Sequence, residues 1–159
     1  MDRTSADPLS VPPPGNSGAD VRRFEDVVEV VPDDVVGDPI LWIPTKCNFA
    51  AIDCVVTCGK DVFFIQITTA QRHDIVLRSV NGKEGLLTMV EALETCGFDV
   101  GRRQGIRFVW ITPEPFQGSS FPLRGDLNDG DKALAGAIKQ YNCIIPMACD
   151  AEPTEPKAM

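Results

Sequence analysis

Two strand-like segments decide how this chain folds: AAIDCVVTC at residues 50–58 and DVFFIQITT at residues 61–69. Only Gly59 and Lys60 stand between them. A two-residue connection that begins with glycine is typical of a type II′ β-hairpin, because glycine reaches the positive φ that this turn requires. The two segments are therefore predicted to form an antiparallel hairpin at the centre of the fold.

The turn also sets which residues face each other across the hairpin. Counting outward from it places Thr57 opposite Val62 and Asp53 opposite Gln66. Side chains alternate between the two faces of a strand, so Gln66 and Thr68 are expected on the face that carries Asp53. Directly opposed side chains have Cβ atoms about 4.5–5.5 Å apart, which is close enough for both to touch one ion or one water.

Asp53 is the unusual residue of the hairpin because it interrupts the apolar run AAI–CVV. An unpaired carboxylate in an apolar environment costs several kcal/mol, so Asp53 requires a partner. Two explanations remain open from the residues alone. Either Asp53 binds a metal ion, or it accepts hydrogen bonds from Gln66 and from backbone amides and orders the hairpin.

Residues 82–96 are predicted to form a helix after the hairpin. Asn81 can cap its first turn, and Glu84 stands where a capping box requires an acidic residue. Gly97 is placed to end the helix in the left-handed conformation. One apolar stripe at helical spacing is expected to face the core: Leu86, Met89, Val90 and Leu93.

Three further segments follow this helix. Residues 106–112 (IRFVWIT) are nearly all apolar, as expected of a strand that is covered on both faces. Residues 131–141 are predicted as a second helix and residues 143–148 as a last short strand. The apolar side of the second helix would consist of Leu134, Ala137, Ile138 and Tyr141. The predicted fold class is therefore α/β, with a mixed sheet in which helix, strand, helix and strand follow a central β-hairpin.

Two segments precede the hairpin. Residues 40–43 (ILWI) are predicted to form a short buried strand that ends at Pro44. Residues 24–31 (FEDVVEVV) are compatible with either a helix or a strand, since their valine content favours a strand. The helical alternative rests on a stripe of four apolar side chains: Phe24, Val27, Val28 and Val31.

Composition divides the chain into a body and two polar ends. Residues 1–20 and 150–159 are polar and rich in Pro, Gly, Asp or Glu, so both are predicted to be disordered. The body, residues 21–149, has the size of a single α/β domain. No segment approaches the roughly 20 apolar residues of a membrane helix, and the first residues lack the apolar run of a secretory signal. No membrane contact and an intracellular location, cytoplasm or nucleus, are therefore expected.

The net charge of −8 argues against a general nucleic-acid-binding surface, because an acidic body repels phosphates unless its basic residues cluster. Two arginine pairs, Arg22-Arg23 and Arg102-Arg103, are more readily explained as solvated surface residues. The cysteines form no CxxC pair and are expected to be buried, reduced thiols. They are Cys47, Cys54, Cys58, Cys96, Cys143 and Cys149.

Several short motifs, taken in order, resemble a known family. They are residues 41–44 (LWIP), residues 48–53 (NFAAID), residues 63–68 (FFIQIT) and then His73. This order resembles the C-terminal region that Crinkler-type effectors share with trypanosomatid retrotransposon hot spot proteins. The similarity covers roughly residues 38–115, including the predicted helix and the strand that follows it.

The resemblance implies a restriction-endonuclease-like core, with an αβββαβ order and a hairpin that carries an Asp and then a Glu-x-Lys or Gln-x-Lys motif. Asp53 and Gln66 would then be the metal ligands, Thr68 would occupy the lysine position, and His73 would join the catalytic group. The implied cofactor is magnesium, which takes hard oxygen ligands and retains waters, one of which attacks a phosphodiester. Taken by itself, His73 is more typical of a surface or capping residue.

The chain departs from the family pattern at Thr68, which supplies no positive charge. Lys83 or Arg72 would have to replace the missing lysine. The second carboxylate is also unassigned, and the candidates for it are Glu25, Asp26 and Glu29.

Two functions therefore stay open. The first is a degenerate or weakly active recognition module of an effector or mobile-element protein. Such a module would bind a protein, a nucleic acid or an upstream ATPase domain of longer relatives. The second is an active metal-dependent nuclease that cleaves DNA or RNA. The fold alone does not decide between them.

Overall fold

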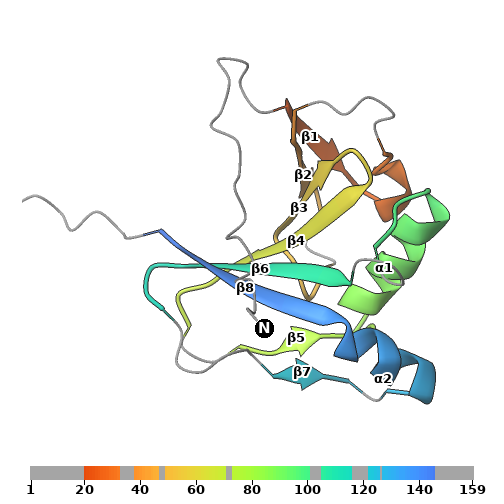
Figure 1. Ribbon diagram of the computed structural model, residues 1–159, viewed down its shortest axis with the longest axis vertical. Coiled ribbons are helices and arrows are strands. Elements are labelled where there is room, and N and C mark those ends of the chain that lie inside the picture. Colours follow the sequence, from red (N-terminus) through yellow and green to blue (C-terminus); the bar gives the residue numbers. More distant parts are fainter. Residues whose placement is uncertain are drawn as a thin grey trace, which may run out of the picture.

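The computed structural model describes residues 20–32, 38–46, 49–70, 73–100, 105–115, 122–125 and 127–145. Within these ranges six strands form one sheet in the order β1-β2-β3-β4-β6-β8, and β5 pairs with β7 (Figure 1). The strands are β1 Asp20–Phe24, β2 Ile40–Pro44, β3 Cys54–Cys58, β4 Asp61–Ile67, β5 Ile75–Val76, β6 Ile106–Thr112, β7 Leu123–Arg124 and β8 Ile138–Ile144. The helices are the 3-10 helix η1 Val27–Glu29 and the α-helices α1 Leu86–Thr95 and α2 Asp129–Gly136.

The six-stranded sheet is mixed. β3 runs antiparallel to its neighbours β2 and β4, whereas β1 is parallel to β2 and β6 is parallel to both β4 and β8. α1 lies between β4 and β6 in the chain, and α2 lies between β6 and β8. The predicted α/β class with a mixed sheet and a central hairpin is confirmed. The prediction did not include β1, β5 or β7.

The hairpin has the predicted turn, and its register is as predicted from the pair of Cys54 with Ile65 to the pair of Cys58 with Asp61. The predicted pair of Asp53 with Gln66 lies beyond this ladder, and the Asp53 N–H donates to the carbonyl of Ile65 instead. Gly59 adopts a positive φ of +57°, as the first residue of a type II′ turn requires. Thr57 pairs with Val62, as counted from the turn. Both strands are shorter than predicted, because residues 50–53 and 68–69 lie outside them.

The sheet has two unlike faces. The helix face packs against α1 and carries fully buried side chains, namely Val55, Val62, Phe64, Phe108 and Trp110. The open face carries side chains that are only half-buried, among them Val56, Phe63 and Val109. The helices η1, α1 and α2 lie along one side of the sheet (Figure 1). The prediction that residues 106–112 are covered on both faces was therefore wrong, since burial alternates along β6.

The first α-helix begins later than predicted. The expected span was residues 82–96, with a capping box at Asn81 and Glu84, but α1 begins at Leu86. Asn81 instead has a positive φ of 53°. The backbone carbonyl of Glu84 accepts a hydrogen bond from the N–H of Ala50, at 2.9 Å. The prediction of a capping box was wrong, because this segment pairs with a distant part of the chain before the helix starts.

Gly85 precedes α1, and its lack of a side chain is required there. The N–H of Leu87 donates to the carbonyl of Leu77, at 2.9 Å, so the first turn packs directly on that part of the backbone. A Cβ atom on Gly85 would lie 2.6 Å from the same carbonyl oxygen. A residue with a capping side chain would therefore clash at this position.

The apolar stripe of α1 is buried as predicted, and its members are Leu86, Met89, Val90 and Leu93. Each such side chain contributes roughly 1.5–3 kcal/mol when it is fully buried. The helix ends at Thr95, and Gly97 follows with a φ of +100°. Its predicted role as the left-handed residue after the helix is confirmed.

The second helix ends earlier than predicted. The expected span was residues 131–141, but α2 ends at Gly136 and β8 already begins at Ile138. Ile138 and Tyr141 therefore belong to a strand, where they pair with Ile106 and Val109 of β6. A complete hydrogen-bond ladder with the buried strand β6 stabilises this segment more than one further helical turn would. The predicted last strand was thus placed too late in the chain.

Residues 24–31, for which helix and strand were both open, contain the end of β1 and the helix η1. The buried side chains are Phe24, Val27 and Val30. The predicted stripe was wrong in two members, since Val28 is 57% exposed and Val31 is 49% exposed. A 3-10 helix repeats every three residues, which explains the observed spacing.

The segments predicted to be disordered, residues 1–20 and 150–159, lie outside the described residues except for Asp20, where β1 begins. Among the helices that the structure describes, none is long and apolar enough to cross a membrane.

The described cysteines are all free, but they are less buried than predicted. Cys54, Cys58 and Cys96 are half-buried and Cys143 is exposed. The first two lie on the open face, and Cys143 lies at the edge of the sheet on β8, so no described helix covers them. Cys47 and Cys149 lie outside the described residues.

Candidate functional site

Asp53 lies directly before β3 at the open end of the hairpin, and it is exposed. Its carboxylate accepts a hydrogen bond from the backbone N–H of Ile67, at 2.7 Å. Its own N–H donates to the carbonyl of Ile65, at 2.8 Å. Asp53 thus continues the ladder between β3 and β4 with its side chain.

Gln66 is 8% exposed and lies on the helix face of β4. Its amide Nε2 lies 3.5 Å from Nε2 of His73. Its amide oxygen Oε1 is buried, and it has no hydrogen-bond partner among the described residues. A buried polar atom without a partner lowers the stability of a protein by about 1–3 kcal/mol, so this oxygen destabilises the core.

His73 is held by two contacts in addition to Gln66. Its Nδ1 lies 3.1 Å from the carbonyl oxygen of Asp74. Since a carbonyl oxygen only accepts, Nδ1 is the donor in this contact. The ring also packs against Trp110, with 5.5 Å between the ring centroids. The structure therefore brings together two predicted site residues, Gln66 and His73.

Thr68 lies just after β4, at the position that a lysine would occupy in the family pattern. Its hydroxyl accepts a hydrogen bond from the N–H of Ala70, at 3.0 Å, and its own N–H donates to the carbonyl of Ile111. Lys83 is exposed, and its backbone pairs with Val80. Arg72 lies outside the described residues.

The three candidates for a second carboxylate lie around η1. Asp26 caps this helix, and the side chain of Glu29 completes the capping box. Glu25 forms an ion pair with Lys46, at 2.7 Å. All three residues are exposed, so their contacts serve the local structure of the surface.

Sequence reasoning missed two hydrogen-bonded polar pairs in the strands beyond Gln66, between β6 and β8. Trp110 Nε1 donates to Oε1 of Gln140, at 2.9 Å. Thr112 donates to Oδ1 of Asn142, at 2.8 Å. These pairs join β6 to β8, and only the parallel register of the two strands brings them together. No motif in the sequence signals them.

The donor atoms of these residues decide whether they can hold magnesium. Magnesium requires about six oxygen ligands in octahedral geometry, of which proteins usually supply one or two carboxylates. Asp53 offers one carboxylate that already accepts a backbone N–H, and Gln66 offers an amide oxygen that is sealed from solvent. In the described ranges no three His, Cys, Asp or Glu side chains gather around one point. This donor set does not fit magnesium.

Cys54 follows Asp53 on the open face. Burial raises the pKa of its thiol to about 11, and the negative charge of Asp53 adds to this effect. A thiol with so high a pKa is almost entirely protonated near neutral pH and is a poor nucleophile. Cys54 is therefore not a candidate for nucleophilic catalysis.

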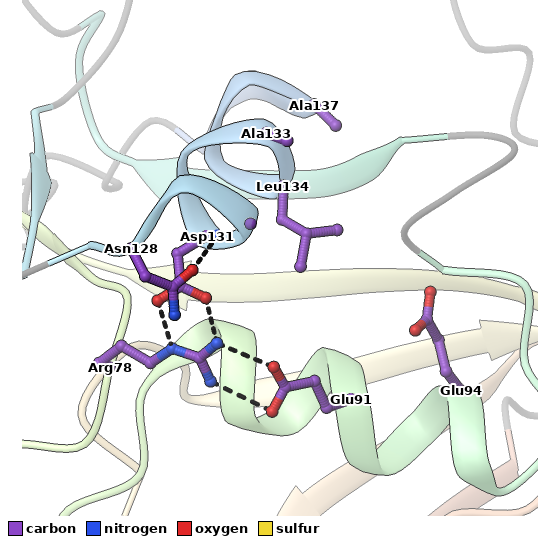
Figure 2. A pocket seen from close by; sticks show the side chains of 9 residues that line it. Arg78, Glu91, Glu94, Asn128, Asp131, Ala133, Leu134 and Ala137 are labelled. Atoms are coloured by element: carbon purple, nitrogen blue, oxygen red, sulfur yellow. Dashed lines mark hydrogen bonds and ion pairs between the residues drawn. The ribbon is translucent and has the colours of Figure 1, made fainter.

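A cleft of about 600 Å³ lies between α1 and α2, away from the hairpin. Arg78 stands in it and donates hydrogen bonds both to Glu91 of α1 and to Asp131 of α2 (Figure 2). Asp131 is 4% exposed, and the hydrogen bond from Arg78 lowers the pKa of its carboxyl group. Carboxylates of both helices thus face the Arg78 guanidinium on two sides. Arg78 therefore links α1 to α2.

Comparison of the chain with protein-family models, with curated proteins and with solved structures finds no match.

Proposed function

We propose that this chain is a recognition domain that binds a protein partner without cleaving nucleic acid, built on a restriction-endonuclease-like core of the kind expected in Crinkler-type and retrotransposon hot spot proteins. Apart from the two-residue strand β5, which lies between β4 and α1 and outside the six-stranded sheet, the order β2-β3-β4-α1-β6 corresponds to the βββαβ part of that core. The motif-bearing hairpin, β3 and β4, lies in the middle of the sheet, where such a domain would carry its site.

The observation that carries the proposal is the hydrogen bond from the Ile67 N–H to the Asp53 carboxylate. A metal-dependent nuclease requires this carboxylate for an ion, whereas here one of its two oxygens, Oδ2, accepts a backbone N–H of the hairpin. Thr68 also accepts a hydrogen bond from a nearby backbone N–H, and it offers no positive charge to a phosphate. Both motif positions therefore serve the structure of the hairpin.

The charge of the chain supports a protein partner over a nucleic acid. The net charge is −8, and Arg22 is paired with Asp20 at 2.7 Å. Arg107 is paired with Asp61 at 3.0 Å. Binding to a phosphate backbone depends on clustered basic residues that are free to displace counterions.

The test compares thermal melts of the wild type, Asp53→Asn and Asp61→Asn, each with and without millimolar Mn²⁺. Asp61→Asn is the control for the dependence on Mn²⁺, because it makes the same change at the other end of the hairpin, where it also removes the ion pair with Arg107. We expect the wild-type Tm to be indifferent to Mn²⁺ and Asp53→Asn to melt earlier in both conditions. Incubation with single- and double-stranded DNA and RNA should leave the nucleic acids intact.

The nuclease alternative makes the opposite forecast. Mn²⁺ would then raise the Tm of the wild type and of Asp61→Asn but not that of Asp53→Asn, and nucleic acid would be cut only by the first two. That combination would replace the recognition domain with the nuclease as the function of the chain.

A further inference from the structure

The two edges of the six-stranded sheet differ in how they are protected. β1 forms one edge, and charged side chains occupy three of its positions, Asp20, Arg22 and Arg23. β8 forms the other edge with the sequence IKQYNCI, in which Lys139 is the only charged residue. Proteins commonly protect edge strands with charges, prolines or short length, because a bare edge pairs with other strands. Of these protections, β8 has a single charge, Lys139, and it has no proline along its seven residues.

The outer side of β8 offers a regular row of backbone groups. Ile106 N–H donates to Ala137, and Ile145 N–H donates to Thr112, so the odd-numbered residues of β8 bond to β6. The N–H and C=O groups of the residues in between then point away from β6. In the part of the chain that the structure describes, no strand lies beyond β8. These outward groups belong to Ile138, Gln140, Asn142 and Ile144.

The side chains of β8 form a nearly palindromic row. If a second copy of the strand runs antiparallel to the first with Tyr141 at the centre, Ile138 faces Ile144 and Gln140 faces Asn142. Apolar residues thus face apolar ones, and amides face amides. The outward backbone groups fall into the hydrogen-bonded pairs of this register, and Tyr141 falls into the closer non-hydrogen-bonded pair.

We propose that β8 is the interface of a homodimer, in which two copies pair antiparallel about a two-fold axis at Tyr141. The occupant of the edge is a second copy because the row matches itself. The two sheets then become one continuous sheet with the helices of both copies on the same side. Exposed apolar side chains also lie at this edge, since Ile144 is 47% exposed and Ile145 is 55% exposed. This inference concerns assembly and goes beyond the proposed recognition function.

The register provides a charge test at Lys139 and Cys143. In the dimer Lys139 faces Cys143 of the other copy, on the open face, and this contact occurs twice. Cys143→Glu should therefore create two ion pairs and tighten the dimer, whereas Cys143→Lys should place like charges opposite each other and weaken it. From the usual size of cross-strand charge pairs, we expect a change of about tenfold in the dimer dissociation constant in each direction.

The measurement is analytical ultracentrifugation of the full chain over a concentration series. The double variant Lys139→Glu with Cys143→Lys should dimerise as tightly as Cys143→Glu, because it forms the same ion pair with the two charges exchanged. Circular dichroism checks that each variant is folded. A wild type that stays monomeric at all concentrations, or equal effects of Cys143→Glu and Cys143→Lys, would overturn the proposal.

A proline pair tests the backbone part of the interface. Ile144→Pro removes an outward N–H and spares the ladder with β6, so it should give a folded monomer. Ile145→Pro removes the N–H that donates to Thr112, at 2.9 Å, and should lower the Tm through the ladder within one copy. A folded Ile144→Pro variant that dimerises like the wild type would exclude this edge as the interface.

Discussion

The carboxylate of Asp53 accepts a hydrogen bond from the backbone N–H of Ile67, at 2.7 Å, across the open end of the central hairpin. Asp53 precedes β3 and Ile67 is the last residue of β4, so the side chain extends the ladder beyond the two strands. In a regular antiparallel ladder a main-chain carbonyl takes this position. The bond accounts for an acidic residue within an otherwise apolar stretch.

Two substitutions of Asp53 should weaken the hairpin to different extents. We expect Asp53→Ala to lower the free energy of unfolding by about 1–2 kcal/mol, because the Ile67 N–H loses a charged acceptor. Asp53→Asn keeps a neutral acceptor, so it should lower the free energy of unfolding by about half as much. Urea denaturation measures both values. An Asp53→Ala variant as stable as the wild type would show that the bond does not contribute.

Gln66 should be replaceable by an apolar residue of similar shape. Its Oε1 is buried without a partner among the described residues, so Gln66→Met removes an unfavourable group and should leave the stability unchanged or raise it by about 1 kcal/mol. The control is Gln140→Met, which removes the acceptor of the Trp110 N–H and should cost about 1 kcal/mol. If Gln66→Met is the more damaging of the two in urea denaturation, the Gln66–His73 contact is stronger than its length suggests.

The Arg78–Asp131 pair should make the fold sensitive to acid. The hydrogen bond from Arg78 lowers the pKa of Asp131 below its ordinary value of 3.8. The stability from this pair is therefore complete above that pH and is lost as the pH falls through the lowered pKa. Arg78→Met should melt several degrees below the wild type at pH 7. This difference should shrink below about pH 4, where acid protonates the aspartate. A constant difference in Tm at all pH values would contradict the assignment.

Two cysteines should react at very different rates. The raised pKa of Cys54, about 11, keeps its thiol protonated, whereas Cys143 is exposed. Iodoacetamide at pH 8 should therefore label Cys143 first, as peptide mapping by mass spectrometry would show. Asp53→Asn removes the negative charge that helps to raise this pKa, so it should accelerate the labelling of Cys54. Equal rates in the wild type and in this variant would contradict that influence.

Two glycines should respond to alanine with opposite signs. Gly85→Ala places a Cβ 2.6 Å from the backbone at Leu77, so it should lower the free energy of unfolding by about 1–3 kcal/mol. Gly136 ends α2 and has nothing within 4 Å of a built Cβ, so Gly136→Ala should gain about 0.5–1 kcal/mol. Thermal melts followed by circular dichroism distinguish the two. A tolerated Gly85→Ala would mean that α1 is free to move away from Leu77.

The predictions that were correct rest on local chemistry. Glycine at position 59 permits the positive φ of the turn, and the turn then sets the register of β3 and β4. The spacing of Leu86 and Leu93 with the residues between them places one face of α1 in the core. Gly97 ends that helix because few other residues adopt its φ of +100°.

The predictions that were wrong concern residues whose partners lie far away in the chain. Glu84 does not cap a helix, because its backbone pairs with Ala50. Tyr141 does not continue α2, because β6 offers a ladder to the segment that contains it. A local pattern is only a weak preference, and pairing with a distant strand outweighs it.

The sequence by itself determined the α/β class, the central hairpin with its register and the buried stripe of α1, since turn residues and apolar periodicity depend on near neighbours. Only the tertiary structure decided what the polar residues do. It gave Asp53 a backbone N–H as its partner, left the Gln66 amide oxygen unpaired and joined Trp110 to Gln140 across parallel strands. The physical reason is that a hydrogen bond depends on distances of about 3 Å between atoms, and the chain sets these distances only when its elements pack.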